Sequence, residues 1–162
     1  AISFPATRSA EDSYFLTCAL LAARQIACVD KPLYHYLMHG ESLSETRNPS
    51  RYRDKIKSFD LLMQFARENG LYEANQAELD YIYLKKGYLL GILTYIYNEQ
   101  QPQQLTLCKI YNHLLSYVPY YKANAYYHAD LKLRLLHTFV RQYPRLAFKV
   151  LPYYIHKTKM KL

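Results

Sequence analysis

Apolar residues recur along most of this chain with the spacing of one face of an α-helix. The first such face is made by Phe15, Leu16, Ala19, Leu20 and Ala23. Further helices are predicted by the same spacing over residues 48–69, 74–98, 105–118 and 124–143, and from Pro144 onward. Asn48-Pro49 is a typical helix start, and Asn69-Gly70 a typical helix end. The pattern therefore predicts a mainly α fold.

One stretch departs from the helical pattern. Between Ile26 and His39, β-branched and aromatic side chains are frequent, which favours extended structure. We expect a small extended or β segment there, followed by four or five helices arranged as a bundle.

The predicted 74–98 helix carries an aromatic stripe, with Tyr81, Tyr88 and Tyr95 spaced by seven residues. Such a stripe can stack sugars, but packing between helices is the favoured interpretation. Gly87 and Gly91 would let another helix come close. The apolar stripe of a regular helix here would contain Leu79, Ile82, Tyr83, Lys86, Leu89, Leu90 and Leu93.

Composition places the chain among globular proteins. It has 162 residues, of which 51% are hydrophobic, which suffices for one domain with a core. The three cysteines, Cys18, Cys28 and Cys108, include no C-x-x-C pair, which favours free thiols in a reducing, cytoplasmic setting. The longest apolar run, Tyr88–Tyr97, is shorter than the roughly 20 residues that cross a bilayer.

Positive charge is concentrated in the last third. The formal net charge is +8, and residues 101–162 carry ten Lys or Arg against the single acid Asp130. This asymmetry predicts an anionic partner for that end, either a membrane surface or nucleic acid. A second basic group crowds the start of the 48–69 helix, where we expect a solvated face made of Arg47, Arg51, Arg53, Lys55 and Lys57.

The segment from Pro144 is amphipathic on a helical wheel. Its apolar side contains Ala147, Phe148, Val150, Leu151, Tyr154 and Ile155. Its other side contains Arg145, Lys149, His156 and Lys159. Pro152 predicts a kink or break. Such a helix either lies in the headgroup region of a membrane or docks on the domain, so a peripheral membrane contact through residues 144–162 stays open.

Glu11 and Asp12 open the first predicted helix. Ser9 is placed to cap it, with Asp12 at the third helical position, as in a capping box. Carboxylates there are favoured by the helix macrodipole, by about 0.3–1 kcal/mol each. By local physics alone, the two acids stabilise a helix start.

The order of motifs over residues 4–46 adds another interpretation. An acid pair in Ala10-Glu11-Asp12 precedes an apolar helix, a β-like segment, and then Pro32-Leu33-Tyr34-x-Tyr36 and Ser42-x-Ser44. This ordered string resembles the end of the catalytic domain of family 2 glycosyltransferases, which have the GT-A fold. The resemblance implies that residues 1–46 end such a domain. Residues 47–162 would then form a helical C-terminal region whose last helix is basic and amphipathic.

The family implies a role for each matching residue. Family members transfer a sugar, with inversion, from a nucleotide-sugar donor to a glycan or lipid-linked acceptor during cell-surface polysaccharide synthesis. Asp12 would take the proton of the attacking sugar hydroxyl, and Glu11 would contact the acceptor or hold the loop. His39 and Ser42 would contact the donor diphosphate. Leu37 departs from the family, in which a basic residue is usual.

Two parts of a complete family 2 enzyme have no counterpart here. No D-x-D motif occurs, and no βαβ pattern precedes Glu11. We therefore expect the C-terminal piece of a longer enzyme, inactive alone, whose Mg²⁺ or Mn²⁺ is held outside this piece. His113, His128 and His137 share no metal-ligand spacing and are interpreted as surface or packing residues. The enzyme would act in the cytoplasm or at the inner face of the membrane.

A different class of function is a non-catalytic, basic helical interaction module. It would serve membrane docking, oligomerisation or nucleic-acid binding. Nucleic acid is the disfavoured partner, because the tyrosines that would stack bases lie on apolar stripes and no nucleic-acid-binding motif is found. Homo-oligomerisation stays open.

Overall fold

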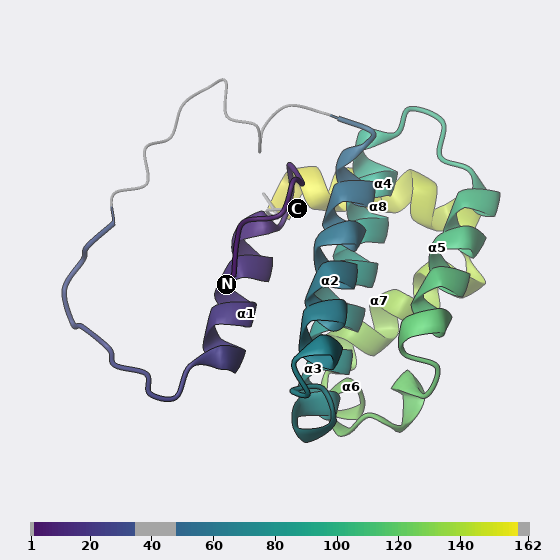
Figure 1. Cartoon of the computed structure of the whole chain (residues 1–162). Helices are drawn as coiled ribbons and strands as arrows, with labels where there is room; N and C mark the ends of the chain where they lie inside the picture. The colour runs from purple at the N-terminus through teal and green to yellow at the C-terminus, as the bar shows by residue number, and fades with distance from the viewer. Residues whose placement is uncertain (1, 35–47, 159–162) are drawn as a thin grey trace.

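Amphipathic helices build this protein by burying their apolar faces against one another. The computed structural model describes residues 2–34 and 48–158, which form a mainly α-helical protein (Figure 1). In chain order the helices are α1 (Glu11–Ala22), α2 (Arg51–Glu68), α3 (Gln76–Ile82), α4 (Leu90–Asn98), α5 (Gln104–Tyr117), α6 (Ala125–Ala129), α7 (Leu131–Gln142) and α8 (Pro144–Thr158). A π-helical segment, Tyr83–Leu89, joins α3 to α4, and single 3₁₀ turns lie at Glu73–Asn75 and Tyr121–Ala123. The mainly α fold class is confirmed.

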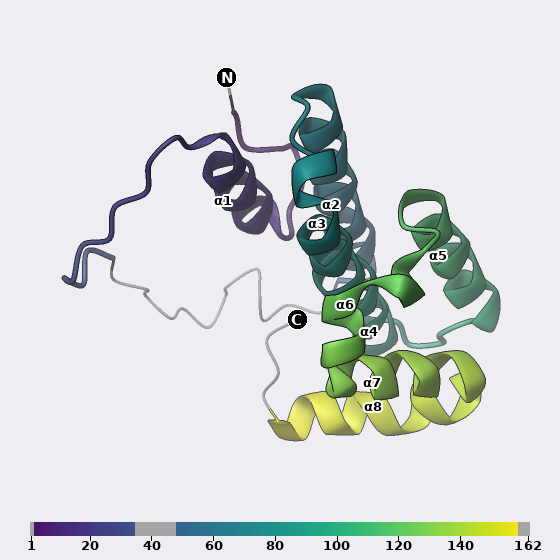
Figure 2. The same cartoon turned by 90° about the horizontal axis from the view of Figure 1, so that it is seen from below.

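Helix α2 lies between α1 and the long helix that ends in α4 (Figure 1). Helix α8 packs against α4 and α7 and runs along one edge of the assembly (Figure 2). The core gathers where these helices meet, and its most enclosed side chains include Phe59, Leu62, Met63, Tyr83, Leu84, Ile92, Leu93 and Ile96. The helix end predicted at Asn69-Gly70 is confirmed, since Gly70 has a φ of 65° and Leu71 N donates to Ala66 O at 2.8 Å.

The long helix packs closely on α2, as its glycines predict. A Cβ added at Gly87 would lie 2.9 Å from Phe59 Cβ, and one added at Gly91 would lie 3.0 Å from Ile56 Cγ1. Tyr88 is buried in the core, so the packing interpretation of the aromatic stripe is confirmed there. A Cβ at Gly87 would force Phe59 or the backbone to shift, and one at Gly91 would press on the Ile56 side chain, so both glycines favour this close packing.

The stripe expected for a regular helix over residues 74–98 is wrong in its middle. Leu84 and Tyr88 are buried, whereas Lys86 is exposed. The cause is the π-helical winding of Tyr83–Leu89, which closes i→i+5 hydrogen bonds and turns less per residue than an α-helix.

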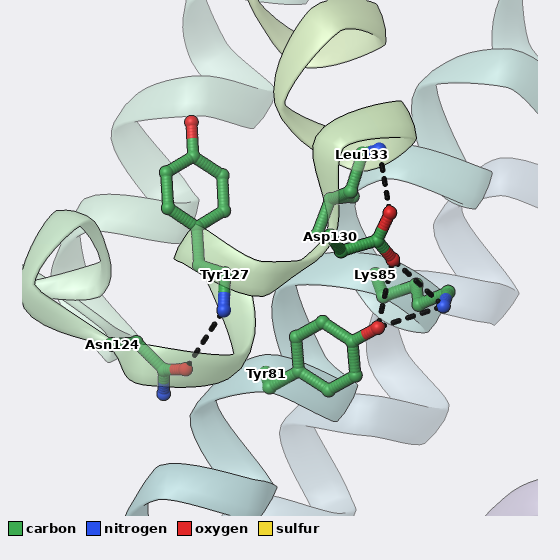
Figure 3. A network of polar contacts seen from close by, with 6 residues as sticks. All are labelled: Tyr81, Lys85, Asn124, Tyr127, Asp130 and Leu133. Atoms are coloured by element: carbon green, nitrogen blue, oxygen red, sulfur yellow. Dashed lines mark hydrogen bonds and ion pairs between the residues drawn. The ribbon is translucent and has the colours of Figure 1, made fainter.

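The single helix expected over residues 124–143 is also wrong, because Asp130 divides it into α6 and α7 (Figure 3). Asn124 caps the first piece as predicted, accepting from Tyr127 N at 3.1 Å. Asp130 caps the second piece, accepting from Leu133 N at 2.9 Å. Two capped helices satisfy the backbone donors that a break would otherwise leave unpaired.

Asp130 also ties α7 to the long helix. Its Oδ2 accepts from Tyr81 Oη at 2.8 Å and from Lys85 Nζ at 2.9 Å, and Figure 3 shows the two side chains converging on it. The Leu133 N–H, followed by Lys85 and Tyr81, stabilises the carboxylate and lowers the pKa of Asp130 to about 2, although its burial acts in the opposite direction.

The extended segment expected over Ile26–His39 is not confirmed as β structure. Its described part ends at Tyr34 and contains no strand, and residues 26–34 are all exposed. A strand needs a neighbour to pair with, and none of the described segments offers one. His35–His39 lie outside the described residues.

Candidate functional site

The acid pair lies where α1 meets α2. Glu11 and Asp12 occupy the first turn of α1, with Asp12 exposed and Glu11 partly exposed. Asp12 Oδ1 accepts from Ser13 N at 2.6 Å. Both acids are therefore open to solvent beside α2.

The capping box expected at Ser9 is wrong. The residue at the cap position is Ala10, which has a φ of 63° and gives no side-chain cap, so the helix starts one residue later than predicted. Ser9 is buried instead, and its carbonyl accepts from Ser58 Oγ of α2 at 2.9 Å. The contact with α2 has turned Ser9 away from the helix start.

Ser58 holds the N-terminal segment on α2. Besides its bond to Ser9, its hydroxyl lies 2.7 Å from Thr7 Oγ1, in a fully buried setting. Two buried hydrogen bonds at this point fix the chain that leads into Glu11 and so position the acid pair over α2.

Lys55 belongs to this site, although the sequence assigned it to a solvated face. It lies on α2 with only 6% of its surface exposed. Burial, reinforced by the positive charges of Arg51 and Lys86 and opposed by Asp12, lowers the pKa of Lys55 to about 8. The expectation of a solvated Lys55 is wrong because α1 covers this part of α2. No spacing in the sequence distinguishes Lys55 from its exposed neighbours.

The remaining residues of the predicted site cannot be placed beside the acid pair. His39 and Ser42, expected at the donor diphosphate, lie outside the described residues, as does Leu37. Within residues 2–34 and 48–158, no group of three His, Cys, Asp or Glu side chains could hold a metal ion.

A second candidate surface lies between α7 and α8. It is an apolar groove of about 590 Å³ lined by Leu131, Lys132, Leu135, Leu136, Phe139, Val150, Leu151 and Tyr154. Leu135 is 62% exposed, and Leu131 and Val150 are also exposed. We call this surface the α7–α8 groove.

The last helix is present as predicted, starting at Pro144 and containing Pro152. Part of its predicted apolar side belongs to the core, because Ala147, Leu151 and Ile155 are buried. Val150 is left exposed, and Lys149 is exposed beside it. In the part of the chain that the structure describes, no helix has the length and hydropathy needed to span a bilayer.

No family model, curated protein or solved structure matches this chain. The resemblance to family 2 glycosyltransferases therefore stays a prediction that rests on the residues that carry it.

Proposed function

We propose that this chain is the acceptor-side, C-terminal part of an inverting glycosyltransferase, in which Asp12 is the catalytic base. The observation that carries the proposal is the exposed carboxylate of Asp12 in the first turn of α1. A sugar hydroxyl becomes a competent nucleophile when a positioned carboxylate removes its proton during attack. Glu11, beside it, would bind the acceptor sugar.

Exposed apolar residues on α1 and in the segment that follows it support the proposal. Leu16 and Leu20 of α1 face solvent while Cys18 packs inward, and Ile26 and Val29 are exposed in the segment that follows. A helix that is apolar on all sides normally lies inside a protein. We assign this surface to contact with a nucleotide-binding α/β half, which would hold the Mg²⁺ or Mn²⁺ and most of the sugar nucleotide.

Lys55 fits the same role. At neutral pH a lysine whose pKa is about 8 is still mostly protonated, so it supplies a buried positive charge near Asp12. Arg51 and Lys86 add to the positive potential around it. Such a potential suits a site that must hold an anionic donor.

Asp12→Asn in the enzyme that includes both halves tests the proposal. We expect kcat to fall by about 10²–10⁴-fold, because the amide cannot accept the proton, while the fold stays unchanged by circular dichroism. Glu73→Gln is the matched control, since it removes an exposed first-turn carboxylate of another helix. Full turnover in Asp12→Asn would remove Asp12 as the base.

A second candidate function is docking on an anionic membrane through the α7–α8 groove. Its exposed leucines would enter the lipid boundary, and Lys132 and Lys149 would meet the headgroups. The excess of ten Lys or Arg over one Asp in residues 101–162 favours an anionic surface over a neutral one. The contact would place the enzyme at the inner face of the membrane.

Flotation of the 162-residue chain with phosphatidylglycerol vesicles tests the docking. We expect co-flotation that is lost in the double variant Leu135→Gln/Val150→Gln and kept in the control Leu105→Gln, an exposed leucine of α5. If both variants float equally well, the groove is not the membrane contact. If the double variant instead converts a dimer to a monomer, a second copy of the chain covers the groove.

A further inference from the structure

A cavity of about 270 Å³ lies between α7 and the 3₁₀ turn that precedes α6. It is lined by Tyr121, Lys122, Tyr127, His137, Thr138, Arg141 and Gln142. The lining contains two cations and no carboxylate. Neither Lys122 nor Arg141 forms an ion pair with any residue in the described ranges 2–34 and 48–158.

His137 lines this cavity and carries an unpaired polar atom. Only 2% of its surface is exposed, and its Nδ1 lies 3.2 Å from Tyr127 Oη. Its Nε2 is buried with no hydrogen-bond partner. When the Tyr127 hydroxyl donates to Nδ1, the ring hydrogen is on Nε2, which is then a donor without an acceptor. A buried donor in this state is unfavourable, so a ligand that accepts from it is favoured.

Aromatic neighbours hold the His137 ring in place. The rings of Tyr88 and Tyr121 lie 5.4 Å and 5.3 Å from it, centroid to centroid. Burial, followed by the charges of Arg141 and Lys122, lowers the pKa of His137 to about 4, so the imidazole is neutral at pH 7. The ring is therefore a fixed, neutral hydrogen-bonding group between two cations.

Among the described residues, Arg141 is positioned by a ring contact that does not use its hydrogen-bond donors. Its guanidinium carbon lies 4.4 Å from the centre of the Tyr111 ring. Stacking of this kind positions the group through its face and leaves the N–H groups in its plane available. Lys122 lines the cavity from the 3₁₀ turn. Its ammonium group has three N–H donors that can rotate to meet phosphate oxygens.

We propose that this cavity binds the phosphate group of a small phosphorylated solute, between Lys122 and Arg141 and within reach of His137. The positive charges of Lys122 and Arg141 match the double negative charge of a phosphate monoester better than they match the single negative charge of a carboxylate. The volume of about 270 Å³ is enough for a phosphate and a small polyol or sugar. The site is separate from Asp12, and the proposal does not depend on glycosyl transfer.

The position of the cavity on α7 favours a free solute over a lipid headgroup. At about 100° per residue, His137 and Arg141 fall on the opposite side of α7 from Leu135 and Phe139, which line the α7–α8 groove. His137 and Arg141, the α7 residues proposed to bind the phosphate, therefore lie on the side of α7 away from a membrane that would contact the α7–α8 groove.

Calorimetric titration of the 162-residue chain with inorganic phosphate and with glycerol 3-phosphate, at constant ionic strength, tests the proposal. We expect saturable binding that Arg141→Gln weakens by about tenfold or more and that Arg141→Lys weakens less, since it keeps the charge. Lys132→Gln on the opposite side of α7 is the control and should change affinity less than twofold. Titration of His137 followed by ¹H–¹⁵N NMR should show its pKa rising when phosphate is bound.

Three outcomes would overturn the assignment. Equal weakening in Arg141→Gln and Lys132→Gln would mean a general attraction of anions to a basic protein. Absence of saturable binding of either probe, in a chain whose folding is verified by the same NMR spectra, would mean that the cavity is not a phosphate site. Binding to phosphatidic acid vesicles that depends on Arg141, without binding of glycerol 3-phosphate, would make the ligand a lipid headgroup.

Discussion

The N-terminal segment, residues 2–34, and the helical body, residues 48–158, treat their apolar residues in opposite ways. In the body, α2 turns its apolar face inward with Phe59, Leu62 and Met63. In the N-terminal segment, α1 has apolar residues all round and α2 covers only one side, so that Leu16 stays 60% exposed. The body encloses most of the core and leaves apolar side chains exposed mainly at the α7–α8 groove, whereas α1 contributes Cys18 to the core and leaves another apolar face uncovered by the described chain. That difference is why we place the missing contact of the proposed enzyme at α1.

The largest effect should come from the body. Phe59→Ala should lower the free energy of unfolding by about 3–5 kcal/mol, because it empties the contact between α2 and Gly87. Leu16→Ala, a large-to-small change on the exposed side of α1, should cost less than about 0.5 kcal/mol. Urea denaturation measures both. Equal costs would mean that the two regions are not distinct in packing.

The next effect is a pH dependence located in the body. The pKa of His137 is about 4 in the folded chain against 6.5 in a free histidine, so between these values the unfolded state binds a proton that the folded state does not. The contribution is constant above about pH 6.5, and stability should fall as the pH falls toward 4, by at most about 3 kcal/mol. The free energy of unfolding of His137→Phe, measured by denaturation at each pH, should decrease less steeply over this pH window. Identical slopes in the two proteins would exclude His137 as the source.

A smaller effect should separate the two regions. Ser58→Ala removes the buried contacts of Ser58 with Thr7 and with the Ser9 carbonyl, at a cost of about 1–3 kcal/mol. Hydrogen exchange should then accelerate in α1 while the core of the body stays protected. Ser116→Ala, which removes an exposed hydroxyl bonded to the His113 carbonyl, is the control. It should leave hydrogen exchange unchanged both in α1 and in the core of the body. Faster exchange throughout the chain would mean that the N-terminal segment and the body unfold as one unit.

The smallest effect concerns the tie between α7 and the long helix. The Lys85 side chain is 45% exposed, so its ion pair with Asp130 is screened by solvent and should contribute about 0.2–1 kcal/mol. A double-mutant cycle of Asp130→Asn and Lys85→Met isolates this coupling. Asparagine also caps helices well, so the cap on α7 should survive the change. A coupling well above this range would mean that the pair is better shielded than its exposure indicates.

Much of the fold was predictable because it depends on local signals. Gly70 ends α2, Asn124 caps α6, Pro144 starts α8, and Gly87 and Gly91 mark the close approach of two helices. Each of these is a property of a residue type at a helix end or at a contact. Asp130 carries the same kind of signal, but the continuous apolar spacing around it favoured a single helix, and the break became evident only from its bonds to Tyr81 and Lys85.

The candidate site was less predictable. Glu11 and Asp12 lie in the first turn as expected, but the Ser9 cap was wrong because contact with α2 outweighed the local capping preference. The burial of Lys55 is a tertiary effect, since α1 covers one lysine among several similar ones. The unpaired Nε2 of His137 is equally a product of packing: a histidine on an apolar stripe has the same sequence pattern whether or not its second nitrogen finds a partner.

The π-helical segment Tyr83–Leu89 rotates the side chains of α4 about the helix axis relative to where a regular α-helix continuing from α3 would place them. Residues before it and after it point in directions that no single helical wheel describes. Deleting one residue within it would let the segment wind as an ordinary α-helix and leave α4 close to its present orientation, because six α-helical residues turn through nearly the same total angle as seven π-helical ones. A related chain could therefore lack one residue here and keep the same packing, so any alignment of this chain with another should match residue numbers separately on the two sides of the segment.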